Sequence, residues 1–93
     1  MDNTGVKSEM DQQKVHDILA GFVLPNEIEK LDTVFGLDST GDPAVWLTFH
    51  VRDTAKIGQN ELERLTRFLS EVTSALLQAN IAAFPYTRLE QAA

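Results

Sequence analysis

Residues 31–51, LDTVFGLDSTGDPAVWLTFHV, decide the fold, because two alternating runs flank a short polar segment. Apolar and polar side chains alternate most clearly in the second run, which is the pattern of a strand with one buried face. Between the runs, Gly41 can adopt a positive φ, and Asp38 can accept hydrogen bonds from the backbone of its own turn. The stretch therefore predicts two strands, at about 30–37 and 44–52, joined as a hairpin.

The register of this hairpin sets which side chains share a face. We expect Leu37 to lie opposite Val45, which places Gly36 across from Trp46. An indole over a glycine shields bare strand backbone from water. The apolar face, which would form the core, carries Leu31, Phe35, Leu37, Val45, Leu47, Phe49 and Val51. The opposite face would expose Trp46, Thr48, His50 and Arg52 to solvent.

Two amphipathic helices are predicted, one before and one after the hairpin. The first, at about 9–23, carries an apolar stripe with the helical period and ends before Pro25. The second, at about 61–79, repeats apolar residues at spacings of three and four. Asn60 is its expected N-cap, and Asn80 is its expected C-terminal cap.

A last strand is predicted at about 83–89. It contains Pro85, which cannot donate a ladder hydrogen bond, so we expect an edge strand. Two orientations are open for its aromatic residues. In one, Phe84, Tyr86 and Arg88 face away from the helices and form an aromatic and basic platform. In the other, Phe84 and Tyr86 turn inward and join the core.

The predicted elements follow the order α-β-β-α-β. We expect a single α+β domain at residues 8–90, preceded by a flexible tail at residues 1–7. Its three-stranded sheet would have both helices packed on one face. This is the order of a ferredoxin-like βαββαβ fold that lacks its first strand.

Composition and charge limit the functional classes. The chain has a net charge of −6, and the whole excess of acid over base lies in residues 1–45. It has no cysteine, which excludes disulfides, thiolate metal sites and cysteine nucleophiles and fits a cytoplasmic location. No apolar run approaches the roughly 20 residues of a membrane span, so we expect no membrane association. An acidic surface repels phosphate backbones, which disfavours nucleic acid and favours a partner protein with a basic surface.

No constellation of residues points to catalysis. The sequence has no HExxH, P-loop or GxGxxG motif, and its two histidines, His16 and His50, lie far apart in the chain. Asp38 and Asp42 could offer oxygens to a metal, but their loop lacks the calcium-loop pattern. The segment at 38–41 is also one residue longer than the Asp-Ser/Thr-Gly loop of aspartic proteases. We therefore expect no enzyme activity, no cofactor and no metal.

The open sheet face is the predicted site. An exposed tryptophan on an uncovered sheet is typical of a protein interface, because Trp, Tyr and Arg dominate binding hot spots. The expected interaction residues are Trp46, His50 and Arg52, an acidic rim of Asp38 and Asp42, and Tyr86 and Arg88 from the last strand. Binding of a single-stranded nucleic acid through the aromatic residues is the second hypothesis. A small-ligand or enzyme pocket is the third. A homodimer, through this face or through a strand edge, is compatible with the pattern.

Residues 28–90 resemble a group of small, uncharacterised bacterial proteins. The shared pattern is an apolar strand, a Thr-Gly-Asp-Pro-Ala turn at 40–44, a second apolar strand, an amphipathic helix and the ending Phe84-Pro85-Tyr86. The resemblance implies an accessory gene product, such as the antitoxin-like half of a pair with a helical partner. The element order is also similar to that of an iron–sulfur cluster assembly domain, but that family relies on a cysteine that this chain lacks.

Overall fold

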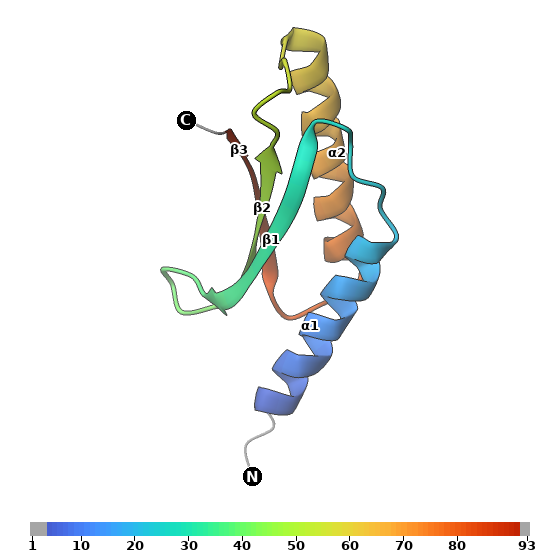
Figure 1. Cartoon of the computed structure of the whole chain (residues 1–93). Helices are drawn as coiled ribbons and strands as arrows, with labels where there is room; N and C mark the ends of the chain where they lie inside the picture. The colour runs from blue at the N-terminus through green and yellow to red at the C-terminus, as the bar shows by residue number, and fades with distance from the viewer. Residues whose placement is uncertain (1–3, 92–93) are drawn as a thin grey trace.

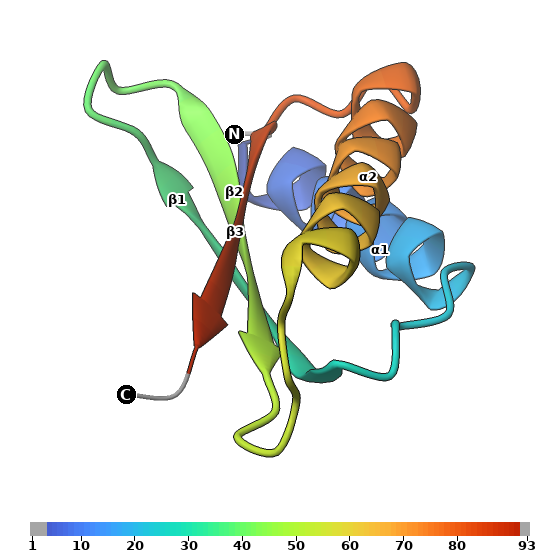
Figure 2. The ribbon, with the colours of Figure 1, turned by 90° about the horizontal axis from the view of Figure 1, so that it is seen from above.

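The computed structural model describes residues 4–91, and their side chains from residue 11 onward. The elements, in chain order, are α1 (Thr4–Ala20), β1 (Ile28–Leu37), β2 (Pro43–Val51), α2 (Gln59–Gln78) and β3 (Phe84–Gln91). The three strands form one sheet, and both helices lie on the same side of it (Figures 1 and 2). The predicted α+β fold and its α-β-β-α-β order are confirmed.

The sheet is mixed, with strand order β1-β2-β3. β1 and β2 form the antiparallel hairpin, whereas β2 and β3 pair in parallel, with α2 as the connection between them. In a ferredoxin-like sheet, another strand separates the two strands of such a split unit. That strand has no counterpart among residues 4–91, so β2 and β3 pair directly. β3 is an edge strand, as Pro85 predicts.

The hairpin register differs from the expected one by two residues. Trp46 lies opposite Val34, and Gly36 lies opposite Ala44. The reason is a tighter turn. The Asp38 N–H donates to the Asp42 carbonyl at 2.8 Å, so the two strands stay paired up to Asp38 and Asp42. Leu37 therefore lies opposite Pro43 instead of Val45.

The contact between the indole and the glycine still forms, but along a diagonal. A Cβ placed on Gly36 would lie 3.3 Å from Cζ3 of Trp46. Diagonal neighbours across a sheet remain within reach of aromatic side chains. The indole therefore covers Gly36 as expected, although the two residues are not opposite each other.

The core lies between the helices and the inner face of the sheet. Its largest fully buried side chains are Val15, Ile28, Val45, Leu47, Phe49, Leu65, Val72 and Leu76. Phe49 of β2 and Phe68 of α2 meet edge to face, with ring centroids 5.6 Å apart. Leu37, which we expected in the core, is 67% exposed. Leu37 is the last residue of β1, and Figure 2 shows the turn end of the hairpin extending away from both helices.

The first helix differs from its expected bounds at both ends. It begins at Thr4 and ends at Ala20, instead of spanning about 9–23. Residues 4–7 are therefore helical rather than part of a tail, and residues 1–3 lie outside the described residues. Helix formers such as Lys7 and Glu9 extend a helix without any apolar stripe, which is why periodicity misses this start.

The second helix begins two residues earlier than expected. Its N-cap is Gly58, which makes no side-chain capping bond, so the assignment of Asn60 as N-cap is wrong. Gly58 and Glu61 have the same three-residue spacing as Asn60 and Glu63, and spacing alone could not choose between them. Asn80 follows the C-cap residue with a φ of 61°, so its role in ending the helix is confirmed.

Candidate functional site

An aromatic cluster, defined as Trp46, Phe84 and Tyr86, stands on the sheet face that the helices leave uncovered. Trp46 and Tyr86 are partners in the parallel register and stack with centroids 6.0 Å apart and an interplanar angle of 16°. Phe84 and Tyr86 tilt against each other at 5.0 Å. Phe84 is 49% exposed and Tyr86 is 40% exposed. Of the two orientations open to the last strand, the structure shows the outward platform.

Pro85 explains this orientation. It is buried on the inner face of the sheet, and neighbouring residues of a strand point to opposite faces. Phe84 and Tyr86 therefore face outward together. Because Pro85 occupies the buried position between them, an inward arrangement of both aromatic residues would bring the proline to the surface instead.

Val34 extends the cluster across all three strands. It lies opposite Trp46 on β1, and Trp46 in turn lies opposite Tyr86 on β3. The side chain of Val34 is 59% exposed. The three residues form one apolar row across the sheet. Within residues 4–91, no helix or strand covers this face. Alternation along β1 already puts Val34 on this face, but the sequence-based site did not include it.

Asp38 organises the turn beside the cluster. Its Oδ1 accepts hydrogen bonds from the Thr40 N–H at 2.9 Å, the Thr40 hydroxyl at 2.7 Å and the Asp42 N–H at 3.0 Å. These bonds, with that from the Thr40 side chain foremost, hold the pKa of the Asp38 carboxyl below its ordinary value. Gly41 completes the turn with a φ of 85°, in the region that glycine tolerates best. The turn therefore presents a firmly ionised carboxylate.

The turn and the cluster are joined by one contact. The Tyr86 hydroxyl donates to Oδ2 of Asp38 at 3.3 Å. Partial burial, followed by the nearby Asp38 charge and this bond, raises the pKa of Tyr86 above its ordinary value. The Tyr86 hydroxyl therefore stays protonated at physiological pH and can donate its hydrogen bond to Asp38.

Asp42 lies next to Asp38 and forms an acidic rim with it. The Thr40 hydroxyl lies 3.0 Å from Oδ2 of Asp42, so one hydroxyl contacts both carboxylates. Among residues 11–91, whose side chains are described, the ion pairs involve other acids, namely Asp32, Glu27 and Glu90. The two carboxylates of the acidic rim therefore carry negative charge that no side chain in the described part of the chain neutralises by an ion pair.

The basic residues of the predicted site are engaged within the protein. His50 Nε2 lies 2.6 Å from Oδ2 of Asp32 on β1. Arg88 donates to the Thr48 hydroxyl at 3.3 Å and to Glu90 at 3.2 Å. These contacts place His50 and Arg88 on the open face, away from the acidic rim.

Arg52 lies beyond the end of β2. Its Nε donates to the backbone carbonyl of Asn26 at 2.8 Å, which ties it to the loop before β1. Trp46, Tyr86, Asp38 and Asp42 are therefore brought together by the fold, whereas Arg52 is separated from them.

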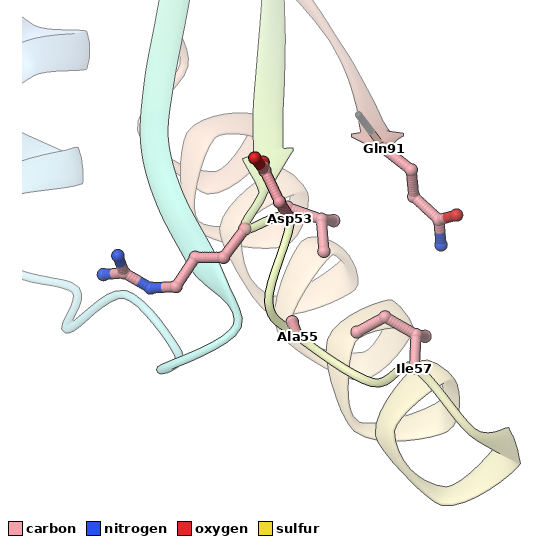
Figure 3. A pocket seen from close by; sticks show the side chains of 6 residues that line it. Asp53, Ala55, Ile57 and Gln91 are labelled. Atoms are coloured by element: carbon pink, nitrogen blue, oxygen red, sulfur yellow. The ribbon is translucent and has the colours of Figure 1, made fainter. Parts of the chain in front are cut away.

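A shallow pocket lies at the other end of β2 (Figure 3). It is lined by Val51, Arg52, Asp53, Ala55, Ile57 and Gln91. Figure 3 shows Asp53 and Gln91 at neighbouring strand ends, with Ala55 and Ile57 along the loop to α2. No nucleophile with an adjacent base lines it, so its residues suggest no reaction.

Among the side chains that the structure describes, those of residues 11–91, no group of three or more His, Cys, Asp or Glu is arranged to hold a metal ion. None of the helices described for the chain is sufficiently long and apolar to span a membrane.

Comparison with known proteins gives no relative. No family model matches the chain, and neither a curated protein nor a solved structure matches it significantly. Function is therefore inferred from the open face itself.

Proposed function

We propose that this protein is a small binding module that docks a partner protein on its open sheet face, as an antitoxin-like or accessory subunit. The observation that carries the proposal is the aromatic cluster on the uncovered sheet face, where Phe84 and Tyr86 are exposed, Trp46 is half-buried rather than fully exposed, and the acidic rim lies beside them. Trp and Tyr supply much of the energy of protein interfaces, and they act best near the centre of an apolar patch. The row formed by Val34, Trp46 and Tyr86 provides such a centre.

The acidic rim defines the chemistry of the partner. Asp38 and Asp42 offer carboxylates next to aromatic rings, and an arginine can pair with a carboxylate while it stacks on an aromatic ring. The net charge of −6 steers a basic partner toward the protein and raises the rate of encounter. The partner that fits this face presents an apolar patch flanked by arginine or lysine.

Binding of a single-stranded nucleic acid is the second candidate. It is favoured by the stack of the half-buried Trp46 on the exposed Tyr86, which resembles the platforms that hold unpaired bases. The unneutralised carboxylates of Asp38 and Asp42 oppose it, because a phosphate backbone would pass close to them. A protein partner accounts for the aromatic cluster and the acidic rim together.

The test uses two exposed apolar residues of matched accessibility. Phe84 on the open face is 49% exposed, and Leu77 on α2 is 50% exposed. The full chain, the Phe84→Ser variant and the Leu77→Ser variant are each immobilised and mixed with the purified products of the neighbouring genes. We expect the wild type and Leu77→Ser to retain the same protein and Phe84→Ser to lose it, with thermal melting as a check on folding.

Equal retention by the wild type and both variants would show that the open face is not the docking surface.

An Asp38→Asn/Asp42→Asn variant tests the acidic rim, and we expect it to bind more slowly and with a weaker dependence on salt. A labelled single-stranded oligonucleotide tests the second candidate. If the oligonucleotide binds and its affinity falls steeply as the salt concentration rises, the ligand of the open face is a nucleic acid and the proposal of a protein partner is wrong.

A further inference from the structure

The free edge of β1 is the second surface that the fold leaves without a partner. β1 is ten residues long and forms one edge of the sheet, with no strand beyond it among residues 4–91. Exposed edges are normally protected by charged residues, proline or a bulge. Here the bulge and the charges lie at the start of the strand, and the half nearest the turn, residues 33–37, has none of these features. An edge of this kind can accept another strand.

The hydrogen-bonding pattern identifies which backbone groups are free. Asp38 bonds Asp42 across the hairpin, and bonded pairs alternate with non-bonded pairs along an antiparallel ladder. The even-numbered residues of β1 therefore direct their N–H and C=O groups to β2. The odd-numbered residues, Leu31, Thr33, Phe35 and Leu37, direct theirs to the free edge.

We propose that a second copy of this chain pairs with this edge, antiparallel, with Val34 of each copy opposite Val34 of the other. The dimer uses the edge of the sheet rather than its open face, although Val34 and Asp38 border both surfaces. A two-fold axis through this pair sets Lys30 of one copy opposite Asp38 of the other, at both ends of the paired stretch. These are opposite charges on the same face of the sheet, and such cross-strand pairs are favourable.

The same register covers exposed apolar surface. Leu31 of one copy lies opposite Leu37 of the other, so the leucine that no helix of its own copy covers gains an apolar neighbour. Val34, which is 59% exposed, meets its equivalent in a non-bonded pair, where side chains approach most closely. All four odd-numbered residues obtain backbone partners.

Registers centred on neighbouring residues of β1 are less favourable than this one. An axis at Asp32 sets that carboxylate opposite its own copy, and an axis at Phe35 sets Asp32 opposite Asp38. Like charges directly opposite each other destabilise a sheet. An axis at Thr33 pairs no charges, and an axis at Leu31 leaves the residues nearest the turn unpaired.

The resulting dimer has one continuous six-stranded sheet. Its two-fold axis is perpendicular to the sheet, so all four helices lie on one face and both aromatic clusters lie on the other. The net charge of each copy opposes this association over long distances. At physiological ionic strength such repulsion is screened beyond about 8 Å, whereas the paired edges lie in direct contact.

The test places charges on the two-fold axis. Val34→Asp and Val34→Lys variants of the full chain are measured alone and as an equimolar mixture, by light scattering across a concentration series. We expect the wild type to show twice the monomer mass of 10.3 kDa. Each variant alone should dimerise at least about tenfold more weakly, because like charges meet at the axis. The mixture should recover the dimer, because an aspartate then meets a lysine.

Two further variants distinguish this edge from other surfaces. Thr33→Pro removes an N–H group that points to the free edge and leaves the hydrogen bonds between β1 and β2 in place, so we expect it to fold and to lose the dimer. Phe84→Ser should keep the dimer, because it alters only the open face. A wild type that remains monomeric at every concentration would overturn the proposal. A dimer that survives Val34→Asp, or one that Phe84→Ser dissolves, would also overturn it.

Discussion

The Tyr86 hydroxyl donates a hydrogen bond to Asp38 Oδ2, which joins the last strand to the turn of the first hairpin. The two residues are far apart in the chain and come together because β3 pairs with β2 in parallel. The contact holds the aromatic cluster and the acidic rim in one arrangement. A partner that binds both features therefore meets a surface whose parts are already positioned.

Removing the Tyr86 hydroxyl should be visible at Asp38. In a Tyr86→Phe variant we expect the pKa of Asp38 to rise slightly, yet to stay below its ordinary value, because the bonds from Thr40 and Asp42 remain. The carboxyl carbon shift of Asp38, followed by NMR through an acid titration, measures this change. An unchanged Asp38 titration would mean that the contact does not persist in solution.

Stability should fall in acid, partly through Asp38. Its pKa is lower in the folded protein than in the unfolded chain, so ionised Asp38 stabilises the fold above the unfolded pKa of about 3.9. This contribution is lost as the pH drops through the folded pKa. The free energy of unfolding, measured by urea titration at several pH values, should show this loss in the wild type.

The Asp38→Asn variant is the control for that titration. An amide keeps an oxygen for the turn hydrogen bonds and has no charge to lose. We expect its unfolding free energy to depend less on pH below about 4 than that of the wild type. Parallel curves for the two proteins would rule out Asp38 as a source of acid sensitivity, and Glu27, whose pKa Arg64 also lowers, would be examined next.

A side chain at Gly36 should displace the indole. The Cβ of a Gly36→Ala variant would lie 3.3 Å from Trp46 Cζ3, which is closer than an ordinary contact. We expect the ring to shift on its flexible side chain and the fold to remain. The single tryptophan makes its fluorescence a direct readout, and an emission spectrum identical to that of the wild type would contradict the close approach.

Two adjacent leucines of α2 should respond very differently to truncation. Leu76 is fully buried in the core, whereas Leu77 is 50% exposed. Leu76→Ala should reduce the free energy of unfolding by about 2–5 kcal/mol, through lost burial and the cavity left behind. Leu77→Ala should change it by less than about 0.5 kcal/mol. Similar effects of the two substitutions in urea denaturation would contradict the placement of α2 against the sheet.

Much of the fold follows from local patterns. Alternation around the turn predicts the hairpin, and the apolar stripe after Leu62 predicts the long helix. The register could not be predicted, because it depends on where Asp38 and Asp42 close the turn. The parallel pairing of β3 with β2 could not be predicted either, because the pattern of residues 83–89 indicates a strand but not which strand it pairs with.

The residues of the candidate site were predicted where local patterns place them, and missed where distant segments meet. Trp46 follows from alternation, and Asp38 and Asp42 follow from the turn. The outward direction of Tyr86 stayed open because either face of a short strand can be buried, and the burial of Pro85 resolves it. The role of Thr40 was missed, although an aspartate in a turn commonly accepts a hydrogen bond from the backbone N–H two residues later. Contacts between distant segments, such as that of Tyr86 with Asp38, have no local signature.

The parallel pairing of β3 with β2 also bears on how the chain folds. The β1–β2 hairpin closes through a few residues and can form within microseconds. β3 joins β2 only by closing a longer loop that contains α2, and such non-local pairing is slow. The stack of Trp46 on Tyr86 is completed in this late step. Partially folded chains therefore lack the aromatic surface, and any partner that requires it would select molecules that have finished folding.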